Sequence, residues 1–337
     1  MKRRFNYVFF DISGIKNFGK DKDNYFYICT EELQKESDIR VISYPMDYLP
    51  YIFHLLFTLH YYPKLNQLIS LPFKSIWYPY YFKNDFKEER PLCFIMSAYY
   101  VTPEYLRYLK TRYPNSKAVL IHRDLIHLWH KRNPAFTSQS IKELFDLRMT
   151  YDVNEAKKYG LLHFDEFESK TMVPIAPQYP LSDVFFAGYA KNRLPALLRA
   201  YDILSANGLQ CDFYIVGTSQ DQRVIKPGIT YSDHQISYRE MLYRTVNSRC
   251  ILEINQEGAV GYTSRFLEAV MYNKKLITNN ALIKQSAFYH SGYIQCISDV
   301  NELDADFVKK DIGDIDYKYN GEFSPLNLIN QIDQALP

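Results

Sequence analysis

The feature of this sequence that most constrains its fold is a regular alternation of short apolar runs and helical stretches in the C-terminal half. The runs at 183–188 and 211–217 each end in glycine, and residues 192–207 between them carry apolar side chains at helical spacing. The alternation continues with helices expected at 238–246, 263–272, 282–290 and 300–310 and strands expected at 249–254, 275–279 and 293–297. Strands that are buried on both faces and separated by helices predict a parallel sheet with right-handed crossovers.

The N-terminal half shows a similar but less regular pattern. Its expected strands are 6–10, 40–44, 92–97, 118–122 and 145–151, with helices at 103–112 and 154–159. Residues 171–182 hold three prolines and no periodicity, which predicts a linker. A chain of 337 residues exceeds one hydrophobic core of ordinary size, so we expect two Rossmann-like α/β domains at 1–170 and 183–337. The last helix is free to pack back on the N-terminal domain.

Charge and cysteine content narrow the function classes. The 40 basic and 38 acidic side chains are too balanced for a protein that coats nucleic acid, so no nucleic-acid partner is expected. The five cysteines are far apart, which predicts reduced thiols and a cytoplasmic location. The N-terminal apolar run is short and reads as a first strand rather than a signal peptide.

Aromatic residues are abundant, with 31 Tyr and 22 Phe. Residues 48–63 carry no formal charge, but Pro50 interrupts them and they are shorter than the roughly 20 residues that a spanning helix needs. One interpretation is a core helix with its packing loop. The other is an interfacial surface where Tyr, Phe and Trp77 meet lipid head groups or a lipid-linked acceptor, which implies peripheral membrane contact.

The first motif that could carry chemistry lies at 186–193, where a strand is expected to turn into a helix. Gly188 lets the backbone approach a phosphate, the helix start offers unpaired N–H groups, and Lys191 and Arg193 add positive charge. This pattern predicts a pyrophosphate site. The alternative is a tight turn with two solvated cations.

The second motif lies at 253–269, where a buried strand leads through a glycine-containing loop to a helix. Thr263 or Ser264 can cap that helix. Arg265 and Glu268 are three residues apart and share a helical face, so we expect Arg265 to reach a diphosphate and Glu268 to hold ribose hydroxyls. The alternative is a helical ion pair with an ordinary cap.

The segments 184–193, 211–217 and 261–280 resemble the donor-binding domain of GT-B glycosyltransferases of bacterial surface-polysaccharide clusters, which make capsule, O-antigen or exopolysaccharide. The segment 145–160 resembles the region before the interdomain linker in such proteins. The resemblance implies a nucleotide-sugar donor, two Rossmann-like domains facing across a cleft, an acceptor on the N-terminal domain, and no essential metal or cofactor. The donor-site candidates are Gly188, Lys191, Arg193, Gly217, Tyr231, Tyr238, Asn255, Gly261, Tyr262, Thr263, Ser264, Arg265 and Glu268; Tyr231 and Tyr238 are the candidates for stacking on the base.

One departure from that family bears on stereochemistry. Retaining members carry two Glu separated by seven residues, whereas the position eight before Glu268 is Val260. An inverting enzyme needs a general base for the acceptor hydroxyl. Asp11, directly after the first strand, is the first candidate, and His122 and Asp124 after another strand are the alternatives. An Asp at such a position can instead cap its own loop.

The function expected from these residues is that of a metal-independent glycosyltransferase of the hexosyltransferase class, acting on a glycan or lipid-linked acceptor in the cytoplasm, at the inner face of the plasma membrane. The Asp-x-Asp strings at 21–23, 304–306 and 314–316 do not follow apolar strands, so they are expected to be solvated loop charge rather than metal ligands. Two other functions stay open: a non-catalytic nucleotide- or glycan-binding protein with this fold, and a sugar-nucleotide epimerase.

Overall fold

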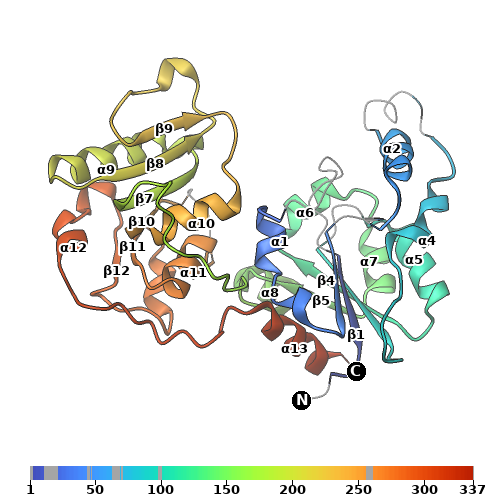
Figure 1. The fold of residues 1–337 in the computed structure, drawn as a ribbon. Coiled ribbons are helices and arrows are strands. Elements are labelled where there is room, and N and C mark those ends of the chain that lie inside the picture. The colour runs from blue at the N-terminus through green and yellow to red at the C-terminus, as the bar shows by residue number, and fades with distance from the viewer. Residues whose placement is uncertain are drawn as a thin grey trace. The chain divides into compact units, whose positions relative to one another are not determined.

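The computed structural model describes residues 3–10, 22–43, 46, 48–62, 69, 71–97, 101–255 and 261–336. Two compact units make up the chain, and each is built on a parallel sheet (Figure 1). Unit 1 comprises Met1–Lys22, Cys29–Asp165 and Ser324–Pro337, and unit 2 comprises Asp23–Ile28 and Glu166–Phe323. The predicted α/β class with two Rossmann-like sheets is confirmed. The second segment of unit 2 begins at Glu166, so the proline-rich residues 171–182 lie within unit 2.

In unit 1 the strand order is β2-β1-β3-β4-β5-β6, with every pair parallel. The strands are β1 (Asn6–Phe10), β2 (Ile39–Ile42), β3 (Leu92–Met96), β4 (Lys117–His122), β5 (Leu147–Thr150) and β6 (Leu162–His163). The helices are α2 (Tyr51–His60), α4 (Tyr78–Tyr81), α5 (Pro103–Arg112), α6 (Ile126–Arg132), α7 (Ser138–Leu144), α8 (Val153–Tyr159) and α13 (Pro325–Ala335). Short 3-10 helices lie at η1 (Leu33–Lys35) and η2 (Lys74–Trp77).

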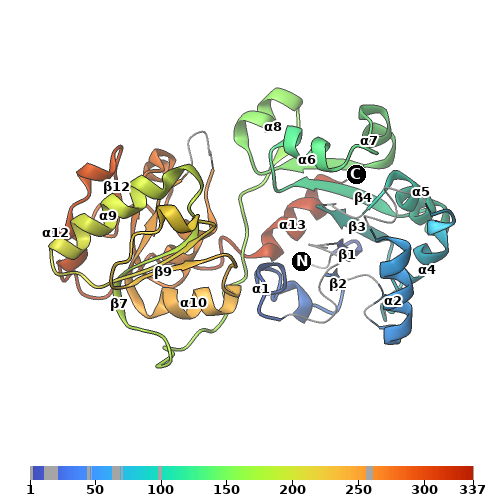
Figure 2. The ribbon, with the colours of Figure 1, turned by 90° about the horizontal axis from the view of Figure 1, so that it is seen from above.

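Alternate residues of the strands in unit 1 pack on opposite faces of the sheet, because successive side chains of a strand point to opposite sides. On one face, Phe10 and Phe94 join a buried cluster with Leu106 of α5 and Trp129 of α6. On the other face, the Tyr7 hydroxyl contacts Asp333 of α13. Figure 2 shows α13 beside the strands of this unit. Burial on both faces explains why β1, β3 and β4 are mostly apolar.

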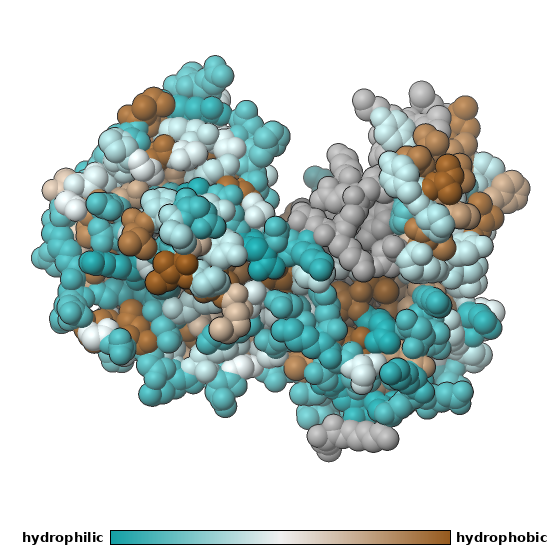
Figure 3. Space-filling model, in the orientation of Figure 1, coloured by the Kyte–Doolittle hydropathy of each residue, from teal (hydrophilic) through white to brown (hydrophobic). Residues whose placement is uncertain are grey.

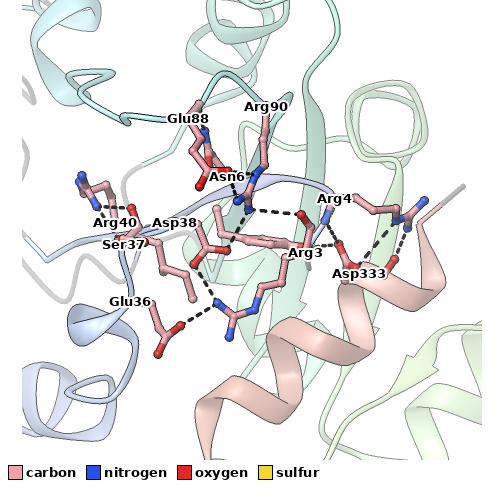
Figure 4. Close-up of polar contacts among 12 residues, drawn as sticks. Arg3, Arg4, Asn6, Glu36, Ser37, Asp38, Arg40, Glu88, Arg90 and Asp333 are labelled. Carbon is pink, nitrogen blue, oxygen red and sulfur yellow. Dashed lines mark hydrogen bonds and ion pairs between the residues drawn. The ribbon is translucent and has the colours of Figure 1, made fainter. Parts of the chain in front are cut away.

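The C-terminal helix α13 is fixed to unit 1 by polar contacts at the start of β1 (Figure 4). Asp333 accepts a hydrogen bond from the backbone N–H of Arg4 at 3.1 Å. Beside it, Arg3 bridges to Asp38 at 2.8 Å, and Arg90 reaches the other oxygen of Asp38 at 3.2 Å. The last residues of the chain therefore complete the N-terminal fold.

The charge-free stretch around α2 is buried on one side only. Phe57 is 2% exposed and packs edge-on against Trp77, with ring centroids 5.6 Å apart. The core-helix interpretation therefore holds for this side. Many large side chains nearby are nevertheless 38–76% exposed (Figure 3): Tyr48, Tyr51, Ile52, Phe53, Leu55, Leu56, Leu59, Tyr62, Ile69, Phe73, Ile76 and Tyr80. We call this set the apolar surface of unit 1.

In unit 2 the strand order is β12-β11-β10-β7-β8-β9, again with every pair parallel. The strands are β7 (Ser182–Tyr189), β8 (Cys211–Val216), β9 (Ile229–Ser232), β10 (Ser248–Glu253), β11 (Lys275–Thr278) and β12 (Ile294–Cys296). The helices are α9 (Leu194–Ala206), α10 (Tyr238–Val246), α11 (Ser264–Met271) and α12 (Ala305–Lys309), with most of α1 (Tyr25–Cys29). The 3-10 helices are η3 (Lys191–Arg193), η4 (Gln220–Gln222), η5 (Ala281–Gln285) and η6 (Val300–Glu302).

Two helices expected in unit 2 are wrong in extent. The helix expected at 282–290 is the 3-10 helix η5, which ends where Ser286 adopts an extended conformation. The helix expected at 300–310 is broken into η6 and α12, because Asp304 leaves the helical conformation and its side chain accepts from the N–H of Asp306 to start α12. β9 was not predicted, since its four residues show no apolar alternation.

The helices of unit 2 cover both faces of its sheet (Figures 1 and 2). Phe186 and Phe213 face α9, where Leu197 and Leu204 are fully buried. On the other face, Ile251 packs with Phe266 of α11, and Phe185 packs with Leu242 of α10. Numbered within the unit, the strands run 3-2-1-4-5-6, the order of a dinucleotide-binding Rossmann sheet. The order reverses between β7 and β10.

Candidate functional site

The reversal of strand order in unit 2 marks where a ligand is expected. Ligands of open parallel sheets bind outside the carboxyl ends of the strands at such a switch point. β7 and β10 are neighbours there, and both predicted motifs follow them: Gly188 to Arg193 after β7, and Asn255 to Arg265 after β10. The topology therefore brings together two segments that are about 60 residues apart in sequence.

Arg193 links the two loops. Its Nε donates to the carbonyl of Tyr189 at 3.0 Å, and its Nη1 donates to the carbonyl of Ile254, directly after β10. A Cβ at Gly188 would lie 2.9 Å from Nη2 of this guanidinium, so a side chain at position 188 would make the end of Arg193 shift. Lys191 is exposed beside it and adopts a left-handed conformation, with φ of +45°. The first motif thus presents two cations at the switch point: Arg193, which is held by two backbone carbonyls, and Lys191, whose side chain is exposed.

Glu253 at the end of β10 controls how α11 begins. It is 2% exposed, and its carboxyl accepts hydrogen bonds from the hydroxyls of Thr263 and Thr278. Burial raises the pKa of Glu253, and these hydroxyls oppose that shift. Thr263 occupies the N-cap position of α11, and its hydroxyl donates to Glu253 while making no capping bond to the helix. Of the two expected caps, Thr263 and Ser264, the structure places Thr263 at the N-cap position, but its side chain makes no hydrogen bond to the first amides of α11.

Arg265 and Glu268 meet on one face of α11, as their spacing predicts, and form an ion pair. Glu268 is fully buried, and both of its oxygens are taken: Oε2 by Arg265 and Oε1 by the Tyr238 hydroxyl at 2.8 Å. A carboxylate that is closed off in this way does not contact a ribose. The structure therefore corrects the ribose role to that of an anchor for Arg265.

The two guanidinium groups of the site affect each other. The pKa of Arg193 is lowered, first by burial and next by the positive charge of Arg265, while Glu253 opposes the shift. The charges of Arg265 and Glu253 therefore both act on the Arg193 guanidinium, and Arg265 is itself paired with Glu268.

The other donor-site candidates differ in how far they are buried. Tyr238 is buried, its ring lies edge-on to Tyr25 with centroids 4.9 Å apart, and its hydroxyl lies between two glutamates, so it does not stack on a base. Tyr231 is half-buried in β9, and its hydroxyl accepts from the N–H of Val224 at 3.2 Å. Gly217 follows β8 with φ of +74°.

The three remaining residues of the second loop are positioned by their neighbours. The N–H of Asn255 donates to Oδ1 of Asn279 at 2.7 Å. The carbonyl of Gly261 accepts from Asn280 at 2.8 Å. Tyr262 packs on Phe266, with ring centroids 4.8 Å apart. Ser264, the first residue of α11, is half-buried.

The candidates for the base lie in unit 1. Asp11 is outside the described residues. His122 at the end of β4 is 3% exposed and lies edge-on to Trp129, with ring centroids 5.0 Å apart. Burial lowers the pKa of His122 to about 4, which His130 and Arg148 reinforce. A covered ring with so low a pKa is a poor base for an acceptor hydroxyl. Asp124 is half-buried in the loop that follows β4.

Two residues of the site were missed. Glu253 lay within the second motif but received no role, because no sequence pattern shows that a strand-end carboxylate accepts from threonines 10 and 25 residues away. Glu168 is fully buried and contacts the Tyr238 hydroxyl. It lies in a segment without regular structure, so periodicity gave no signal for it.

Within the described residues, no group of three His, Cys, Asp or Glu side chains is arranged to hold a metal ion. None of the helices there combines the length and the apolar character needed to cross a bilayer.

Comparison with known proteins places the fold. No family model and no curated sequence matches this chain. Among solved structures, it is similar to an alpha-glucosyltransferase in complex with UDP, at 11% identity, 97% coverage of this chain, 99% of that chain and a TM-score of 0.54. It is also similar to sucrose-phosphate synthase from Thermosynechococcus elongatus, at 12% identity, 98% coverage of both chains and a TM-score of 0.50. The two parallel sheets with their helices therefore form the two-domain α/β fold of GT-B glycosyltransferases.

Proposed function

We propose that this protein is a metal-independent glycosyltransferase that moves a sugar from a nucleotide-sugar donor to a glycan or lipid-linked glycan in surface-polysaccharide synthesis. The observation that carries the proposal is the convergence of Arg193, Arg265 and the uncapped start of α11 at the switch point of unit 2. Positive charge and free amides at a helix start are the groups that bind a diphosphate.

In this proposal the bond between the sugar and the diphosphate breaks while an acceptor oxygen attacks the sugar. Arg193, Arg265 and Lys191 neutralise the charge that develops on the leaving diphosphate, and the amides at the start of α11 assist them. Because these groups are held in place before the reaction, they need little reorganisation as charge develops. On the inverting route, Asp11 takes the proton of the acceptor hydroxyl, with Asp124 as the alternative base.

Nucleotide binding is the first test. Thermal unfolding is followed with UDP, GDP, CMP and TDP, since a ligand that binds only the folded protein raises the Tm. We expect a nucleoside diphosphate to raise it, and Arg265→Ala or Lys191→Ala to remove most of that shift. Arg199→Ala, on the exposed side of α9, is the matched control. The site assignment is wrong if both site variants respond like the parent.

Turnover separates this function from the two others that the fold permits. Slow release of free nucleoside diphosphate from one sugar nucleotide supports transfer. Binding without release indicates a non-catalytic protein, and interconversion of sugars indicates an epimerase. The base is tested in the same assay, where Asp11→Asn is expected to abolish transfer but to leave nucleotide binding unchanged.

We further propose peripheral contact with the inner face of the plasma membrane through the apolar surface of unit 1. Monomeric soluble proteins seldom expose a contiguous apolar patch of this kind without a partner, and aromatic side chains favour the lipid interface. Leu56 and Leu59, 49% and 61% exposed, test this. The double change Leu56→Ser/Leu59→Ser is expected to reduce co-sedimentation with anionic lipid vesicles, while Ile225→Ser, at an isolated exposed position in unit 2, is not. Equal sedimentation of all three proteins would refute the contact.

A further inference from the structure

A chain of buried polar contacts runs through unit 2 from Glu168 to Arg265. The Tyr238 hydroxyl contacts Oε1 of Glu168 and lies 2.8 Å from Oε1 of Glu268. Oε2 of Glu268 contacts Arg265. Glu168 and Glu268 are both fully buried, and Tyr238 is 7% exposed. These four side chains come from three separate segments: the stretch that opens unit 2 at Glu166, α10 and α11.

The hydrogen atoms needed for these contacts indicate that one of the two glutamate side chains is protonated. A tyrosine hydroxyl has a single hydrogen and can donate to one carboxylate only. The second carboxyl oxygen beside it must then donate to the tyrosine oxygen, and it can do so only if that carboxyl is protonated. Two ionised carboxylates on one neutral phenol would repel each other in a buried site.

The surroundings decide which carboxyl keeps the proton. Glu268 has the Arg265 guanidinium on its other oxygen. Oε2 of Glu168 is buried, and within the described part of the chain it has no hydrogen-bond partner. Burial and the negative charge of Glu268 raise the pKa of Glu168 well above its usual value; Glu166 adds to this, whereas Tyr238 and Arg265 oppose it. Tyr238 also faces the Tyr25 ring, with centroids 4.9 Å apart, and Tyr25 contributes to the raised pKa of Tyr238. Glu168 is therefore the neutral member.

We propose that Glu168 is a positioning residue of the diphosphate site, held as a neutral carboxylic acid that donates to Tyr238, which donates to Glu268, which in turn orients Arg265. Loss of the proton would place a second negative charge in the chain, and that charge would compete for Arg265. The role of Arg265 in this inference rests on the proposed function; the proton on Glu168 does not.

The proton is tested without any nucleotide. In the unfolded chain Glu168 ionises near the ordinary value of 4.5, so above that pH folding must take up a proton, and stability falls as pH rises toward the raised pKa of the folded state. Glu168→Gln keeps a donor for Tyr238 and has no charge to lose. We expect its Tm to match the wild type at pH 5 and to exceed it increasingly up to pH 8. Glu143→Gln, at an exposed position on α7, should follow the wild type throughout.

An infrared measurement gives a second view of the same proton. The wild type should show the carbonyl band of a protonated carboxyl at pH 7, and Glu168→Gln should lack it. A constant Tm difference across the pH range, together with no such band in the wild type, would overturn the assignment.

The positioning role is tested with UDP as the probe. Wild-type affinity is expected to fall at alkaline pH, Glu168→Gln to keep its affinity there, and Tyr238→Phe to weaken binding severalfold at every pH because the chain is cut. A Tyr238→Phe variant that binds UDP like the wild type would overturn the positioning role. If the wild type binds no nucleoside diphosphate, the proposed function fails, while the Tm and infrared results still decide where the proton lies.

Discussion

The helices of the two units begin differently. In unit 1 the first amides of α5, α7 and α8 are capped by Thr102, Thr137 and Asp152, at N–H to oxygen distances of 3.2, 3.1 and 2.8 Å. The first amide of α6 donates to the carboxylate of Glu155. In unit 2, α10 is capped by Ser237, but α9 and α11 have no side-chain cap.

In unit 2, α9 and α11 are the helices that follow β7 and β10 at the switch point. In unit 1, α2 and α4 also lack a side-chain cap. A helix start that its own side chain has closed cannot also receive an anion, because the same amides are needed. The comparison teaches that the helices following β3, β4 and β5 in unit 1 begin with amides bound by side chains, whereas the two helices at the switch point of unit 2 do not. At α11 the hydroxyl of the N-cap residue Thr263 donates to Glu253 and makes no bond to the helix.

The largest effect that should separate the units is the loss of Phe57. This ring packs with Tyr61, Trp77 and Tyr81 at centroid distances of 4.6 to 5.8 Å. Phe57→Ala is expected to reduce the free energy of unfolding by about 4 kcal/mol in a urea titration, since it opens a cavity in unit 1. Leu59→Ala, two residues away and exposed, should change it by less than about 0.5 kcal/mol. Comparable losses in the two variants would show that the apolar surface is covered.

The next effect is an acid sensitivity that belongs to unit 1. The pKa of His122 is lowered from 6.5 to about 4, mainly by burial, so the ring is neutral in the folded protein. The unfolded chain binds this proton first, and stability should therefore fall by up to about 3 kcal/mol as pH drops from 6.5 to 4. His122→Gln is expected to reduce this loss of stability between pH 6.5 and 4, measured as the free energy of unfolding at several pH values. A variant with the same loss as the wild type would contradict the burial of a neutral ring.

The cation that links the two loops of unit 2 should have a smaller effect, on binding rather than folding. If Arg193 binds the diphosphate as proposed, Arg193→Ala removes a charge-assisted contact, which corresponds to about 2 kcal/mol or roughly thirtyfold in Kd. Titration calorimetry with the nucleoside diphosphate that gives the largest thermal shift measures this. Arg199→Ala on the same helix should bind normally. Normal binding by Arg193→Ala would mean that α9 and the β7 loop lie outside the site.

The smallest expected effect is the stability difference between two variants of Lys191 that lose the same charge but differ in backbone strain. Its φ of +45° is unfavourable for a residue with a Cβ. Lys191→Gly is therefore expected to be about 1 kcal/mol more stable than Lys191→Ala, while both lose the same charge and weaken nucleotide binding equally. Equal stability of the two variants would show that this conformation is not strained.

The sequence predicts the strands of both units well, because a strand buried on both faces must be an uninterrupted apolar run. β1 and α5 begin and end where expected, and β7, β8 and β10 differ from expectation by one or two residues. The short strand β9 and the broken helices after β11 and β12 were not foreseen. Their few residues are decided by caps and by neighbours in space, as at Asp304.

What the sequence determined by itself is the local chemistry: glycine and cations after β7, a loop and a helix start after β10, and an Arg265–Glu268 pair at helical spacing. Only the tertiary structure decided how these groups are used. It turned Thr263 away from its helix, closed Glu268 and Tyr238 off from solvent, and brought Glu168 to them from a segment 70 residues from Tyr238. The physical reason is that spacing along a chain fixes which residues share a face, whereas burial and the sharing of protons depend on contacts between segments that are distant in sequence.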